Sequence, residues 1–132
     1  MTFVDTIFLL TLINGRDEFH DKAVALSNRY RGLSLVTTDA VLLEVGNGLA
    51  RGFRREAAAL FEELETSAEA TIVRLDPEIF EAGLSLYKLH QDNEWGLVDC
   101  VSFVVMRQLD IEDVLTSDKH FVQAGFRALM RD

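Results

Sequence analysis

The sequence contains one cysteine, one proline and no long hydrophobic run. The single cysteine, Cys100, cannot form an internal disulfide, which agrees with a reducing compartment, and its apolar surroundings indicate a small core residue. The longest apolar stretches, IFLLTLI and VSFVVM, are far shorter than the roughly 20 residues that a membrane helix needs. The N-terminus also lacks the basic start and the small-residue cleavage site of a signal peptide. We therefore expect a soluble, cytoplasmic protein that does not bind membranes.

Positive charge is also scarce. The chain has 13 Lys and Arg residues against 22 Asp and Glu residues, which gives a net charge of −9 at pH 7. This charge repels phosphate backbones at long range, so binding to nucleic acid would require a local basic patch or a bound cation. The candidate patch is Arg51, Arg54 and Arg55, in the segment GLARGFRRE. The same residues are equally compatible with an ordinary solvated helix end.

The length of 132 residues and the hydrophobic content of 48% predict a single domain over residues 1–132. Hydrophobic periodicity predicts strands at 2–5, 33–38, 71–75 and 114–117, with a short fifth strand within 126–130. It predicts helices at 6–14, 17–30, 39–52, 54–66, 77–91 and 97–109. Strands that alternate with helices of this length indicate an α/β protein, a three-layer α/β/α sandwich around a mainly parallel sheet of four to five strands.

Four acidic residues interrupt or end hydrophobic segments: Asp5, Glu44, Asp99 and Asp118. An isolated carboxylate in apolar surroundings costs several kcal/mol or becomes protonated, so four of them indicate a shared cation. Asp5 and Asp118 directly follow strands, and ligands bind at the carboxyl ends of parallel strands. Taken alone, Asp99 also fits a helix N-terminus, and Glu44 also fits a solvated position beside a buried helix face.

A cluster of these four carboxylates needs positive charge. Ionised carboxylates about 6 Å apart repel by ~3 kcal/mol per pair at an effective dielectric of 20. Oxygen ligands without a Cys or His cluster favour Mg²⁺ or Mn²⁺ over zinc. The three histidines do not change this expectation, because His20 and His90 fall on polar helix faces and His120 fits a surface residue or a phosphate contact equally well.

The order of four motifs, FVDTIFLL, TTDAVLLEVGNGL, WGLVDCVSFVVM and VLTSDKHF, resembles the PIN-domain nucleases, in particular the VapC-type toxins of bacterial toxin–antitoxin pairs. The resemblance implies a parallel-sheet α/β/α sandwich whose carboxylate cluster binds Mg²⁺ or Mn²⁺ and cuts RNA. By the same resemblance, Asp5, Glu44, Asp99 and Asp118 are the four acids, and Thr6 and Thr116 support the site. Ile7 and Ser117 depart from the family pattern, but neither change removes an expected metal ligand.

The resemblance also implies partners, namely an RNA substrate, a cognate antitoxin bound in an apolar groove, and a second copy in a homodimer. The amphipathic face formed by Ala57, Ala58, Leu60, Phe61 and Leu64 is a candidate wall for that groove, although ordinary core packing explains it as well.

The function predicted from the sequence is metal-assisted hydrolysis of RNA phosphodiester bonds. Asp5 and Asp99 are the first choice for direct metal ligands, whereas Glu44 and Asp118 could bind directly, bind through water or accept a proton. Arg51, Arg54 and Arg55 would contact RNA. Two alternatives remain, a catalytically idle PIN-like binding module and a receiver-type phospho-acceptor domain.

Overall fold

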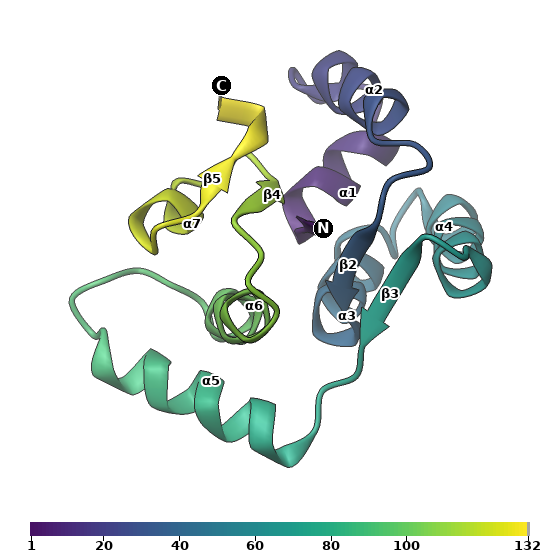
Figure 1. Cartoon of the computed structure of the whole chain (residues 1–132). Coiled ribbons are helices and arrows are strands. Elements are labelled where there is room, and N and C mark those ends of the chain that lie inside the picture. Colours follow the sequence, from purple (N-terminus) through teal and green to yellow (C-terminus); the bar gives the residue numbers. More distant parts are fainter. Residues whose placement is uncertain (132) are drawn as a thin grey trace.

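The structure, a computed structural model, describes residues 1–131, so Asp132, the last residue of the expected domain, lies outside it. Within residues 1–131, five strands form one parallel sheet in the order β3-β2-β1-β4-β5 (Figure 1). The strands are β1 (Thr2–Val4), β2 (Leu35–Thr38), β3 (Ala70–Val73), β4 (Asp113–Leu115) and β5 (Arg127–Ala128). The helices are α1 (Thr6–Ile13), α2 (His20–Arg29), α3 (Asp39–Gly48), α4 (Arg54–Thr66), α5 (Pro77–Leu89), α6 (Leu97–Gln108) and α7 (Lys119–Gln123). The predicted α/β/α architecture is confirmed.

The strand order reverses between β1 and β4. The chain adds β2 and then β3 on one side of β1, and it later adds β4 and β5 on the other side. Because crossovers between parallel strands are right-handed, the two directions of growth place helices on opposite faces of the sheet. Figure 1 shows this arrangement, with α1 and α2 on one side and α5 and α6 on the other. The carboxyl ends of β1 and β4 therefore meet at a topological switch point, where α/β proteins bind ligands.

Local sequence signals explain where several helices begin. The Thr38 side chain accepts a hydrogen bond from the Val41 N–H and caps α3. The Asp76 side chain accepts a hydrogen bond from the Ile79 N–H and caps α5. Pro77 occupies the first turn of α5, where its missing N–H costs nothing. The interior is built from large apolar side chains of the strands and helices, including the fully buried Phe3 and Phe103.

The predicted boundaries differ from the structure in three informative places. The second helix begins at His20 instead of residue 17, because the Asp17 side chain accepts the Phe19 N–H and forms a turn. The third helix ends at Gly48 instead of residue 52, and Gly52 adopts a positive φ of 92° in the following turn. The fifth strand is only Arg127–Ala128, followed by the 3₁₀ turn Leu129–Arg131.

Helix α7 was not predicted, because five residues are too few for an apolar periodicity to appear. In the part of the chain that the structure describes, no helix has the length and hydropathy required to cross a membrane.

Candidate metal centre

Asp5 follows β1 directly and is only 3% exposed. Its Oδ2 accepts a hydrogen bond from the Thr116 hydroxyl, with 2.8 Å between the oxygens. Burial raises the pKa of Asp5 to about 7, and the hydrogen bonds from Thr116 and the Thr6 backbone oppose this rise. The negative charges of Asp99 and Asp118 raise the pKa further. The three carboxylates therefore lie near one another at the carboxyl edge of the sheet.

Asp99 lies in the first turn of α6. Its Oδ2 accepts a hydrogen bond from the Gly96 N–H at 2.9 Å, so the helix N-terminal role considered from the sequence is observed. Burial raises the pKa of Asp99, the Gly96 hydrogen bond opposes the rise, and the charge of Asp118 adds to it. The carboxylate thus combines a local structural role with a place in an acidic group.

Asp118 and His120 open helix α7. The Asp118 Oδ1 accepts the His120 N–H at 2.9 Å and caps the helix. The Nδ1 of His120 lies 3.2 Å from the Asp99 Oδ2 and 3.3 Å from the Asp118 Oδ1. The three residues each offer one ligand atom, and these atoms all lie within 4.8 Å of one another.

Aromatic packing explains why the short helix α7 holds this position. Phe121 is fully buried, and its ring meets the Phe103 ring of α6 edge-on, with centroids 5.0 Å apart. The Trp95 indole N–H also donates to the Gln123 side chain at 3.1 Å, which joins α7 to the loop before α6. The anchored Phe121 leaves its neighbour His120 facing the acids.

Glu44 lies on α3 and is exposed to solvent. Its Oε1 accepts a hydrogen bond from the Thr6 hydroxyl at 2.6 Å. The two threonines that the resemblance assigned to the site thus hold different acids, because Thr116 contacts Asp5 and Thr6 contacts Glu44. Because Thr6 directly follows Asp5 in the chain, this bond places the Glu44 carboxylate beside the start of α1.

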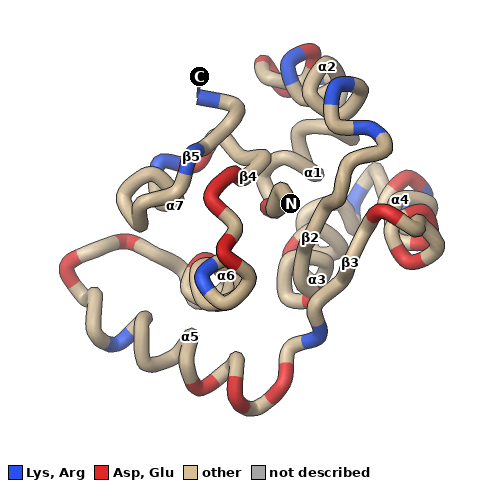
Figure 2. Tube along the Cα trace, viewed as in Figure 1, with Lys and Arg blue, Asp and Glu red and all other residues tan. Residues whose placement is uncertain are grey.

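The three arginines Arg51, Arg54 and Arg55 are exposed, and they lie beyond the C-terminal end of α3. Thr38, the last residue of β2 at the carboxyl edge of the sheet, caps α3, and the helix leads away from that edge. The structure therefore does not bring these arginines to the acids. Figure 2 shows Lys and Arg residues scattered over the molecule without a continuous basic stripe.

Two residues beside the acids were missed from the sequence. His120 was left undecided, although its position two residues after Asp118 was an available signal once a helix start is recognised there. Arg131 donates to the Ser117 carbonyl at 2.9 Å, which places a guanidinium next to Asp118. No sequence pattern indicated this contact, because it depends on the pairing of β4 with β5.

The donor set at the switch point suits a hard divalent cation. Asp5, Asp99 and Asp118 present carboxylate oxygens, and burial together with the neighbouring acids raises the pKa values of Asp5 and Asp99. A divalent cation would offset these negative charges, and carboxylates are the ligands that Mg²⁺ and Mn²⁺ accept.

Comparisons with known proteins agree with this geometry. The chain matches the PIN domain family over residues 2–127, and it therefore belongs to that family. It is 29% identical over 126 residues to the 23S rRNA-specific endonuclease VapC20 of Mycobacterium tuberculosis (strain ATCC 25618 / H37Rv), a match that covers 96% of this chain and 95% of the relative. It is 26% identical over 136 residues to the VapC ribonuclease of Aquifex aeolicus (strain VF5), a match that covers 98% of this chain and 96% of the relative.

A solved structure is also similar. The crystal structure of M. tuberculosis VapC20, described as a Sarcin-Ricin loop cleaving toxin, has a TM-score of 0.86 and 28% sequence identity, and the match covers 96% of each chain. The resemblance to VapC-type PIN domains that the four acidic motifs indicated is confirmed. The receiver-type alternative has no support in these matches.

Proposed function

We propose that this protein is a divalent-metal-dependent endoribonuclease and the toxin of a toxin–antitoxin pair. The observation that carries the proposal is the buried Asp5 carboxylate, which faces Asp99 and Asp118 at the switch point of a PIN-family sheet. The names of two relatives, a 23S rRNA-specific endonuclease and a ribonuclease, support RNA as the substrate.

The side chains divide the work by position. Asp5, Asp99 and Asp118 would hold the cation, Mg²⁺ or Mn²⁺, and Thr116 fixes the Asp5 carboxylate for this task. Glu44, fixed by Thr6, faces solvent and orients water or accepts its proton. When bound, a divalent cation makes water more acidic and offsets the negative charge of the reacting phosphate.

The test is incubation of the purified protein with total RNA in Mg²⁺, Mn²⁺ or EDTA, followed by mapping of the cut ends. We expect cleavage only with a divalent cation, and we expect Asp5→Asn to lose almost all of it. Asp21→Asn, at an exposed position of α2, is the matched control that should cleave normally. Cleavage by wild type that persists in EDTA would exclude the metal mechanism. A protein that neither binds Mn²⁺ nor cuts any RNA would instead be the idle binding module.

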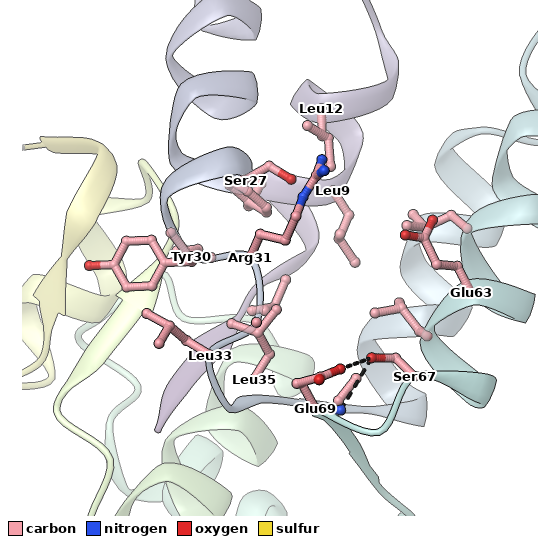
Figure 3. Close-up of a pocket in the computed structure, with 17 residues that line it drawn as sticks. Leu9, Leu12, Ser27, Tyr30, Arg31, Leu33, Leu35, Glu63, Ser67 and Glu69 are labelled. Carbon is pink, nitrogen blue, oxygen red and sulfur yellow. Dashed lines mark hydrogen bonds between the residues drawn. The ribbon is translucent and has the colours of Figure 1, made fainter.

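None of the four acids lines a cavity of about 500 Å³, and we propose this cavity as the antitoxin-binding groove. Figure 3 shows Leu9 and Leu12 of α1 and Leu35 of β2 lining it, with Arg31 and Glu63 among the polar lining residues. Two residues of the predicted groove wall on α4, Leu60 and Leu64, also line this cavity. An apolar recess with charges of both signs suits an amphipathic peptide segment.

The groove proposal is tested by co-purification with the product of an adjacent reading frame. Leu60→Glu should abolish co-purification, while an unchanged melting temperature would show that the fold is intact. We also propose a homodimer, and sedimentation at several concentrations measures its mass directly.

A further inference from the structure

His120 has no part in the proposed mechanism, yet it touches two of the acids. Its side chain is 18% exposed, and its Nδ1 points between the Asp99 and Asp118 carboxylates. A histidine held only for packing would not need both contacts, because Phe121 already anchors α7 in the core.

The spacing of the three atoms suits a shared cation as well as a shared proton. Neighbouring ligands of an octahedral cation with bonds of about 2.1 Å lie about 3 Å apart. The Nδ1 of His120 lies 3.2 Å from the Asp99 Oδ2 and 3.3 Å from the Asp118 Oδ1, close to that spacing. A small adjustment of the side chains would therefore let the nitrogen and both oxygens bind one ion.

The donor type matters for the choice of ion. Oxygen donors alone suit Mg²⁺, whereas an imidazole nitrogen binds first-row transition ions in preference to Mg²⁺. We propose that His120 is a direct metal ligand that, together with Asp99 and Asp118, makes the centre prefer Mn²⁺ and related transition ions over Mg²⁺. This inference rests on the proposed function, because it concerns the same cation.

The backbone supports this assignment. His120 is the second residue of α7, and its own N–H is bonded to the Asp118 Oδ1 at 2.9 Å. This bond fixes the main chain of His120 relative to one of the proposed ligands. Only the two side-chain torsions of His120 must then adjust for its imidazole to bind the ion. Tight metal sites use this kind of preorganisation.

The test is pulsed electron paramagnetic resonance of Mn²⁺ added to protein without a polyhistidine tag. A directly bound imidazole nitrogen modulates the spin echo of Mn²⁺, so this signal reports the ligand and not the activity. We expect the nitrogen modulation in wild type, its loss in His120→Asn, and its retention in His90→Asn. His90 is a suitable control because it lies at the end of α5 against the Trp95 ring, with centroids 4.9 Å apart.

Calorimetry provides the second measurement. His120→Asn should weaken Mn²⁺ binding about tenfold or more and change Mg²⁺ binding much less. Thermal melting in EDTA verifies that each variant is folded, and His120→Gln serves if His120→Asn is not.

The outcomes separate the two proposals. If Mn²⁺ binds in wild type, is lost in Asp99→Asn and shows no nitrogen modulation, His120 is only a hydrogen-bond partner and this inference is overturned, while the nuclease proposal stands. Modulation that persists in His120→Asn overturns it as well. If wild type binds no Mn²⁺ at all, both the inference and the metal-dependent mechanism fail.

Discussion

At the scale of single residues, Asp5 carries the clearest energetic consequence. Its pKa is raised from 3.8 to about 7, mainly by burial, so the folded protein binds more protons than the unfolded chain between these pH values. The stability of the metal-free protein should therefore fall as the pH rises from about 4 to about 7. The decrease is on the order of 4 kcal/mol at most, at 1.36 kcal/mol per pKa unit.

Asp5→Asn removes this charge and keeps an oxygen that can accept the Thr116 hydroxyl. In EDTA near neutral pH, we expect the variant to melt at the same temperature as wild type or higher, and to lose most of the pH dependence between 4 and 7. Mg²⁺ should stabilise wild type more than the variant. The measurement is thermal melting across this pH range with and without Mg²⁺. Destabilisation of the metal-free variant by more than about 2 kcal/mol would show that Asp5 is a structural hydrogen-bond acceptor.

Thr116 offers a second prediction. Its hydroxyl donates to Asp5 and accepts the Asp118 N–H at 3.1 Å, and the residue is fully buried. Thr116→Val should cost about 1–3 kcal/mol of unfolding free energy, because buried polar groups lose their partners. It should also weaken Mg²⁺ binding about tenfold.

The matched control for this variant is Thr37→Val. Thr37 is also buried, but its hydroxyl donates to a backbone carbonyl, that of Val4 at 2.9 Å, instead of to a carboxylate. We expect a similar loss of stability with unchanged Mg²⁺ affinity, measured by denaturant titration and calorimetry. If both variants lose Mg²⁺ affinity equally, the effect is a general loss of order and Thr116 has no special role.

At the scale of helices and strands, the contact between α5 and α6 depends on Gly83. A Cβ at this position would lie 2.8 Å from the Val101 Cγ2 and 3.3 Å from the Val101 Cα. Gly83→Ala should therefore destabilise the protein by about 1–3 kcal/mol through overpacking, despite the better helix propensity of alanine. Denaturant titration measures the change.

Gly46→Ala in α3 is the control, since its Cβ would lie 3.6 Å from the Phe61 ring, an ordinary contact. We expect this variant to be neutral or more stable than wild type. Equal destabilisation by the two substitutions would contradict the close packing of α5 on α6.

The sequence predicted the helices and strands unequally well. Long elements with strong periodicity were found, and the bounds of α4 were predicted correctly, because a 13-residue amphipathic helix repeats its pattern several times. The ends of helices were predicted less accurately, because they depend on individual side-chain contacts such as the Asp17 turn before α2. Helix α7 was missed because a cap and one buried aromatic residue, Phe121, define it.

The residues of the candidate site were also predicted unequally well. Asp5, Asp99 and Asp118 were selected because they break apolar segments, and the structure brings them together. Thr6 and Thr116 came from the family resemblance, and the structure shows which acid each one holds. The position of Arg51 away from the acids could not be predicted, because its distance from the sheet edge depends on where α3 ends.

At the scale of the whole molecule, the net charge of −9 opposes contact with RNA. If Arg51, Arg54 and Arg55 nevertheless bind the RNA backbone, replacing all three with Gln should weaken RNA binding. The slope of log affinity against log salt concentration should become shallower by about 2, because each phosphate contact to a single strand contributes about 0.7. Metal affinity should not change. The measurement is the RNA dissociation constant at several salt concentrations.

The control replaces three exposed arginines elsewhere, Arg16, Arg29 and Arg31, which changes the net charge by the same amount. Its salt slope should stay close to that of wild type. Equal slopes for wild type and the variant of Arg51, Arg54 and Arg55 would show that those arginines do not contact RNA, and Arg131, beside Asp118, would become the next residue to test.

The bond between Thr116 and Asp5 joins residues that are 111 positions apart in the chain. During synthesis, the ribosome makes β1 and Asp5 well before it makes β4, Thr116 and Asp118. The three acids cannot meet on the nascent chain before residue 118 has left the exit tunnel. Any activity that needs all three is thus withheld until β4 and the start of α7 have folded onto β1.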